Sequence, residues 1–177
     1  MTVLAAARSN ADLPAMIRTL VFASLIIVGL AGCSGTAPQG AAESASRLLA
    51  AAAKGDRGAF EAEIDRAAVR EDVRRQMSEV ARAERLDVEG GPSEFALDRM
   101  IGPDAVRLVR AGTGEVVTTA PSAGQLAGQM KSIDGQRACL RNDGAPDRCL
   151  LTFAKVKGGW RLVGMQASDL RIEVAGD

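Results

Sequence analysis

The sequence predicts an α+β fold in which N-terminal helices pack on a C-terminal antiparallel β-sheet. Apolar residues recur at helical spacing from residue 43 to about residue 109, whereas short β-branched and alternating segments follow Gly112. Helices first and strands second are typical of α+β proteins, whose strands pair mainly as hairpins. The chain has 177 residues, which is enough for one domain with one core.

Five helical segments are expected in the first half of the chain. Asp56, Asp65 and Ser93 can each cap a helix, because their side chains accept a hydrogen bond from a first-turn amide. Pro103 suits a first helical position, where its missing N–H has no partner to lose. The predicted ranges are residues 43–54, 56–64, 65–86, 93–100 and 102–109.

Strands joined by hairpin turns are expected from residue 136 onward. The glycine pair at 158–159 is predicted as a two-residue turn, since both positions tolerate positive φ. Pairing about this turn forms an apolar face that should cover the helices. That face consists of Leu151, Phe153, Trp160 and Leu162. The predicted strands are residues 137–141, 148–157 and 160–166, with a short β-branched segment at 115–119, an ambiguous stretch at 120–132, and an edge strand or frayed tail at 170–174.

The first 33 residues carry an export signal. An apolar run from Leu20 to Leu30 follows Arg18 and is too short for a permanent span, which needs ~20 residues. The segment Leu30-Ala31-Gly32-Cys33 resembles the lipobox of bacterial lipoproteins. In that family the cysteine is acylated and the chain is cut just before it. The resemblance implies that residues 1–32 are a signal peptide, with Met16 as an alternative start of translation.

The same resemblance implies a membrane anchor through lipid on Cys33. Ser34 stands where an inner-membrane retention signal would be Asp, so the outer membrane is favoured, with the protein facing the periplasm. We expect a flexible tether at residues 33–42 and a single domain at residues 43–177. The alternative is an ordinary secreted protein whose Cys33 pairs elsewhere.

The other two cysteines, Cys139 and Cys149, are predicted to form a disulfide. They flank turn chemistry at Asn142-Asp143-Gly144, and folding the chain about Gly144 would place them opposite each other. An even pair suits an oxidising compartment. The alternative is a metal site, but two thiolates in a chain without histidine supply only two of the four ligands that a structural zinc site needs. Neither a metal nor a cofactor is therefore expected.

The mature chain resembles an uncharacterised family of small bacterial envelope proteins, a domain of unknown function. More distantly it is similar to the nuclear-transport-factor-two-like cone, from which residues 115–134 depart. Neither resemblance implies catalytic residues. The matching segments are Leu48-Leu49, Lys54-Gly55-Asp56, Phe60, Ile64-Asp65, Gly102-Pro103-Asp104 with the apolar residues after it, and Gly159-Trp160-Arg161-Leu162-Val163.

The helix expected at residues 65–86 carries an apolar stripe and an arginine-rich flank. The stripe consists of Val69, Val73, Met77 and Val80, and the flank includes Arg70, Arg74, Arg82 and Arg85. Such a flank on a lipid-anchored protein could contact anionic headgroups or grip a carboxylate or phosphate. The alternative is a solvated face whose arginine stems cover the edge of the core.

Composition excludes several function classes. The 22 basic and 22 acidic residues balance, which argues against a nucleic-acid binder. The chain has no histidine and no phosphate loop or nucleophile elbow. We therefore expect a non-catalytic envelope domain that binds an unknown protein or small molecule, or supports envelope structure. The alternative is an acid–base enzyme that uses Asp or Glu in a cone-like pocket.

Overall fold

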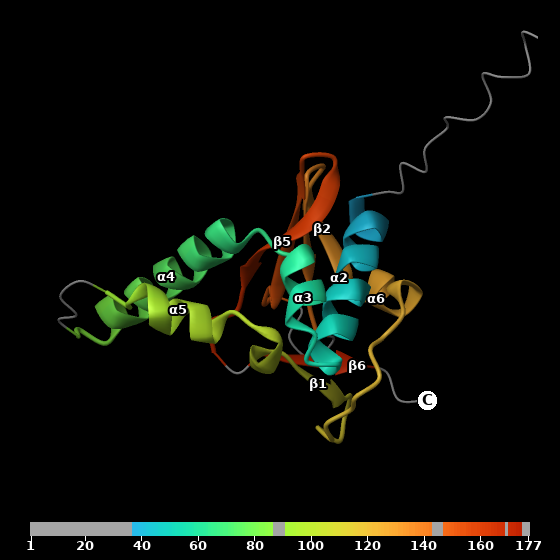
Figure 1. Ribbon diagram of the computed structural model, residues 1–177, viewed down its shortest axis with the longest axis horizontal. Helices are drawn as coiled ribbons and strands as arrows, with labels where there is room; N and C mark the ends of the chain where they lie inside the picture. The colour runs from blue at the N-terminus through green and yellow to red at the C-terminus, as the bar shows by residue number, and fades with distance from the viewer. Residues whose placement is uncertain (1–36, 87–90, 143–146, 169, 175–177) are drawn as a thin grey trace, which may run out of the picture. The chain divides into compact units, whose positions relative to one another are not determined.

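The computed structural model describes residues 37–86, 91–142, 147–168 and 170–174, all within one compact unit, residues 35–177. Helices precede and cover a four-stranded antiparallel sheet, so the predicted α+β class is confirmed (Figure 1). The helices are α2 (Ala37–Ala53), α3 (Arg57–Ala62), α4 (Arg66–Ala83), α5 (Glu94–Met100), the 3₁₀ turn η2 (Pro103–Ala105) and α6 (Ala123–Gln129). The strands are β1 (Arg107–Arg110), β2 (Met130–Asp134), β3 (Arg137–Leu140), β4 (Leu151–Val156), β5 (Gly159–Met165) and β6 (Arg171–Val174).

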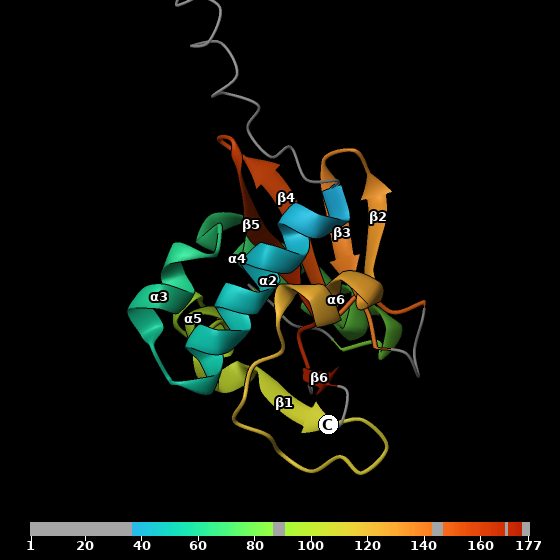
Figure 2. The same ribbon diagram turned by 90° about the vertical axis from the view of Figure 1, so that its right-hand side faces the viewer.

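Helix α2 lies across one face of the sheet, whose strand order is β2-β3-β4-β5 (Figure 2). The helix begins at Ala37, so the prediction of a flexible tether is wrong for residues 37–42. Ala41 and Ala42 are fully buried, because small side chains let the helix approach the sheet closely. Gly40 shows how close the approach is, since an added Cβ there would lie 2.5 Å from Nε1 of Trp160.

The predicted helix caps are confirmed. Asp56 caps α3, Asp65 caps α4 and Ser93 caps α5, each by accepting a hydrogen bond from the backbone N–H three residues later. Helix α4 ends at Ala83, three residues before the predicted Leu86. The start of α4 is hydrogen-bonded to the sheet, because the Asp65 amide donates to the Leu162 carbonyl of β5 at 2.8 Å.

The segment at 102–109 differs from its prediction as a helix. Pro103 begins only a three-residue 3₁₀ turn, after which Arg107–Arg110 forms β1. This strand pairs in parallel with β6, so of the two alternatives for residues 170–174 the strand is the one observed. Leu108 and Val109 are buried in β1. Their strand forms because β6, more than sixty residues further along the chain, pairs with it.

The ambiguous segments also acquire definite structures. Residues 115–119 contribute an isolated bridge between Val116 and Val109 instead of a strand. Residues 120–132 divide into helix α6 and the start of β2. Ser122 begins α6 with a capping box, in which its side chain and that of Gln125 each accept a hydrogen bond from the other residue's backbone amide.

The β4–β5 hairpin has the predicted apolar face but a turn shifted by one residue. The turn residues are Lys157 and Gly158, with φ of 48° and 84°, and Val156 pairs with Gly159. Leu151, Phe153 and Leu162 are fully buried, and Trp160 packs partly buried against the core. A bulge between Thr152 and Phe153 shifts the pairing of β4 with β5 by one residue. Met165 therefore also faces the core, opposite Leu151.

The predicted cysteine pair is present, although the cysteines are not direct partners in the ladder. Cys139 and Cys149 are joined by a disulfide, with Cα atoms 5.6 Å apart. Cys139 of β3 pairs with Thr152, and β4 begins only at Leu151, which pairs with Leu140. The prediction that Cys139 and Cys149 lie opposite each other is therefore wrong, because the chain between the strands is longer than a tight hairpin turn. Asp143 and Gly144, about which that turn was predicted, lie outside the described residues.

Candidate functional site

An open groove of about 930 Å³ lies beside the second half of α4. One wall is the helix itself, with Met77, Val80 and Ala81. The other walls come from the residues before α5 and its last residue, Met100, from the residues just before β4 and from those just after β5. A groove with mostly apolar walls and a few polar groups is the usual form of a binding site for an apolar ligand or peptide.

The groove exists because the apolar stripe of α4 is longer than the core that it covers. Val69 and Val73, in the first half of the helix, are buried beneath the sheet edge. The stripe continues to Met77 and to Val80, whose side chain is 61% exposed, and the following Leu86 is 60% exposed. Exposed apolar side chains that line a groove together indicate a binding surface more strongly than scattered ones.

Gln76 fixes the helix to the sheet at the floor of the groove. Its Nε2 donates to the Met165 carbonyl at 2.9 Å and to Asp72 Oδ2 at 2.7 Å, and its Oε1 accepts from the Ala167 amide at 3.0 Å. The amide side chain of Gln76 therefore uses both its donors and its acceptor. This arrangement holds α4 and the chain after β5 at a fixed separation.

Gln166, on the opposite wall, has spare hydrogen-bonding capacity. Its Nε2 donates to the Ser168 carbonyl at 2.6 Å. Its Oε1 is buried and has no partner, and it is the one such side-chain atom found among the described residues. A buried acceptor without a donor is costly, and the burial of this oxygen also keeps it from contacting a ligand in the groove as the side chain stands.

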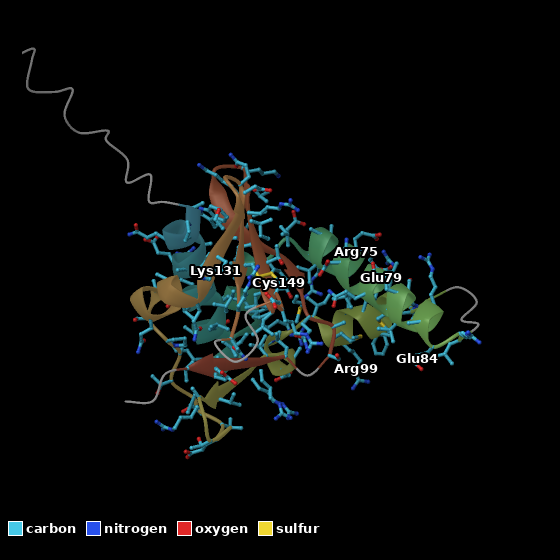
Figure 3. The ribbon with its side chains drawn as sticks, turned by 180° about the vertical axis from the view of Figure 1, so that it is seen from behind. Arg75, Glu79, Glu84, Arg99, Lys131 and Cys149 are labelled. Carbon is cyan, nitrogen blue, oxygen red and sulfur yellow. A yellow bond between two sulfur atoms is a disulfide. The ribbon has the colours of Figure 1, made fainter. Side chains whose placement is uncertain are left out.

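The disulfide borders the same groove. Cys149 is one of the lining residues, while Cys139 is fully buried in β3. Cys149 Sγ also lies 3.3 Å from Thr152 Oγ1. The bond therefore holds residues 148–149 against the sheet and fixes one wall of the groove. Figure 3 shows Cys149 at the sheet, with Arg75 and Glu79 along α4 and Glu84 just after it.

The predicted arginine flank does not form one uniform surface. Arg70 and Arg74 turn toward α5, where Arg70 contacts Asp98 at 2.6 Å and both arginines contact Glu94. Arg82 instead lines the groove. Arg85 lies just beyond the helix in the left-handed region with φ of 55°. Two of the four arginines are thus matched by acids of the neighbouring helix.

Asp98 is the centre of the contacts between α4 and α5. Its Oδ1 accepts from Arg70 Nε and Nη2 and from Arg66 Nη1, at 2.6 to 2.9 Å. These hydrogen bonds, those from Arg70 above all, lower the pKa of the Asp98 carboxyl. The pKa of the Asp134 carboxyl is also lowered, first by the Gln136 amide and then by Arg137. The hydrogen bonds that Arg66 donates to Glu61 raise the pKa of the Arg66 guanidinium above its ordinary value.

The carboxyl groups of the described residues lie outside the groove. No Asp or Glu among the described residues lines the groove, and the described carboxyls with a shifted pKa have it lowered. Over the same residues, no three His, Cys, Asp or Glu side chains lie close enough together to hold a metal ion. None of the described helices is both long enough and apolar enough to span a bilayer.

Sequence reasoning did not find the groove residues. Gln76, Gln166, Met100 and Arg148 come from four separated segments, and the fold brings them together. One signal was present, since the stripe from Val69 to Val80 is longer than a small sheet edge can bury. Cys33, the predicted lipidation site, lies outside the described residues. Comparison of the chain with protein-family models, curated proteins and solved structures found no match.

Proposed function

We propose that this protein is a lipid-anchored envelope protein that binds an apolar ligand or peptide segment in the groove beside α4, without catalysing a reaction. Acylation at Cys33 anchors it on the periplasmic side, with the outer membrane favoured. The anchor rests on the segment Leu30–Cys33, which resembles a lipobox. The binding activity rests on the continuation of the α4 stripe beyond the core, to the exposed Val80.

The groove also defines the chemistry of its ligand. Met77 and Met100 offer flexible, polarisable side chains that adapt to different apolar shapes. Arg82 and Arg148 stand among the apolar residues, and no described acid lines the groove. A ligand with an apolar body and an anionic group fits this set of side chains.

The alternative, an acid–base enzyme, requires a buried carboxyl with a raised pKa in the pocket. The pKa values of Asp98 and Asp134 are shifted in the opposite direction, and neither residue lines the groove. No described feature favours this alternative.

The anchor is tested by metabolic labelling with a clickable fatty acid. The wild-type protein should become labelled and partition with membranes, whereas Cys33→Ala should stay unlabelled. Equal label on both proteins, or label on neither, would reject the anchor.

The groove is tested by placing a photocrosslinking amino acid at position 80 in intact cells. Crosslinking at this position should give a discrete product that the additional change Met77→Glu abolishes, because a charge on the groove wall opposes apolar binding. Position 116 is the matched control, since Val116 is also exposed, by 67%, but does not line the groove. The same products at both positions, or none at position 80, would contradict the proposal.

A further inference from the structure

The first turn of α2 and the tips of two hairpins lie together at one end of the sheet (Figures 1 and 2). Gly40 of α2 packs against the Trp160 indole, and Trp160 is the cross-strand partner of Lys155. The Lys155 amide in turn donates to the carbonyl of Gln136, in the β2–β3 turn, at 2.9 Å. These contacts join the start of the described chain to both hairpin tips.

This end of the sheet carries unmatched positive charge. Lys155 and Lys157 are exposed at the β4–β5 tip, and Arg161 is half-buried on β5 close by. None of the three forms an ion pair with a described residue, unlike the arginines that face α5. The acid at the neighbouring tip, Asp134, is already paired with Arg137 at 2.8 Å. We call Lys155, Lys157 and Arg161 the basic end.

An exposed apolar side chain accompanies these charges. Ile133 is 45% exposed on β2, two residues before the β2–β3 turn, and Lys131 lies exposed two residues earlier. Figure 3 shows Lys131 on the sheet, well apart from the labelled residues of α4. Basic residues beside an apolar one are the usual composition of a surface that rests on anionic headgroups.

Covalent connectivity limits how far this end can lie from an anchor. Ala37 follows Cys33 by four residues, which span at most about 14 Å when fully extended. A lipid on Cys33 would therefore keep the first turn of α2 close to the bilayer surface. The argument from connectivity rests on the anchor in the proposed function, whereas the charge of the basic end does not.

We propose that the basic end is the membrane-contacting surface of the domain and binds the anionic phospholipid headgroups of the bilayer that holds the anchor. Lysine ammonium groups attract phosphates without needing a fixed geometry, and their flexible stems let the charges reach the headgroup layer. This surface differs from the arginine flank of α4, where Arg70 and Arg74 are paired with α5.

The contact would orient the binding groove. Arg148 and Cys149 precede β4 and Gln166 follows β5, so the groove lies at the opposite end of this hairpin from Lys157. Six strand residues separate the two ends, which is about 20 Å at the usual rise. A domain resting on its basic end therefore holds the groove away from the bilayer and open to a partner in the periplasm.

Vesicle flotation of residues 35–177 tests this proposal without the anchor. The whole described core lies between Ala41 and Ile172, so this part retains it. It should bind vesicles made of equal parts phosphatidylglycerol and phosphatidylcholine, and not vesicles of phosphatidylcholine alone. Lys155→Glu combined with Lys157→Glu should weaken binding by about 30-fold or more, since each basic residue near such a surface contributes a several-fold gain.

The matched control is Arg85→Glu combined with Arg99→Glu. It makes the same change in net charge on residues that form no ion pair with a described partner, Arg85 just after α4 and Arg99 on α5. This pair should lower the affinity by less than about 3-fold. Equal losses in the two variants, no loss in the lysine variant, or equal binding to neutral vesicles would overturn the proposal. Fatty-acid labelling of Cys33 reports separately on the anchor, so the two ideas can fail independently.

Discussion

The sheet with α2 and the α4–α5 pair are stabilised in different ways. In the first region Leu48, Leu49 and Phe153 are completely buried, together with most of the inward-facing strand residues. In the second, only Val69 and Val73 of the 18 residues of α4 are buried, and Leu97 alone of the seven of α5. The two helices are joined instead by arginines that meet carboxylates at the surface.

This difference indicates where the molecule can adapt. Burial of apolar area is the main favourable contribution to folding, whereas ion pairs in contact with water contribute little each and weaken in salt. We therefore expect α5 and the second half of α4 to open at a lower free energy than the sheet. The groove lies between the two regions, with one wall on α4 and another in the residues that flank β4 and β5.

The largest effect is expected from Phe153→Ala, in the sheet region. Phe153 is fully buried opposite Leu162, so truncation removes apolar contacts and leaves a cavity. The free energy of unfolding should fall by about 3–5 kcal/mol, measured by urea denaturation of residues 35–177. Val116→Ala, at an exposed site, should change it by less than about 0.5 kcal/mol. Similar losses in the two variants would show that this face is not the main core.

A smaller and local effect is expected from Asp98→Asn. The change removes the charge that Arg66 and Arg70 share, so α5 should separate from α4 more often. Residue-resolved hydrogen exchange should become faster in α5, while the amides of β4 and β5 keep their rates. Glu115→Gln is the control, because Glu115 pairs with Arg110 away from α5. Faster exchange throughout the sheet would contradict the separation into two regions.

The smallest effect is expected on acidification. Because the folded-state pKa of Asp98 is lowered, its stabilising contribution is complete above the ordinary carboxyl pKa and is lost as the pH falls through the folded value. The protection of α5 amides relative to their intrinsic exchange rates should therefore fall at acidic pH before the protection of the sheet amides does. Asp98→Asn should abolish this pH dependence in α5. Asp134 titrates in the same direction at the β2–β3 turn, so the probe must be local to α5.

Local rules of the chain predicted the elements whose causes lie within one turn. Asp56, Asp65 and Ser93 cap their helices because a capping bond needs only an oxygen and an amide three residues away. The alternation about the hairpin turn likewise predicted that Leu151, Phe153 and Leu162 face the core, whereas Met165 faces it because of the bulge. The shift of the turn to Lys157 was less visible, since lysine seldom adopts positive φ.

Elements that depend on distant partners were missed. The segment at Arg107–Arg110 resembled a helix, yet it becomes a strand because β6 supplies its hydrogen bonds. The start of α2 at Ala37 was missed because small residues resemble a tether until a sheet is present to pack against them. Of the candidate site residues, the cysteine pair was predicted, but the groove was not.

The amino-acid sequence alone determined the class of fold, the starts of α3, α4 and α5 and the apolar face of the hairpin, because capping, periodicity and turn chemistry act between near neighbours. Only the tertiary structure decided that Arg70 and Arg74 face α5, that the apolar stripe of α4 continues into a groove, and that the hairpin tips lie beside the start of α2. These features depend on which segments meet, and that outcome is set by the burial of the whole core.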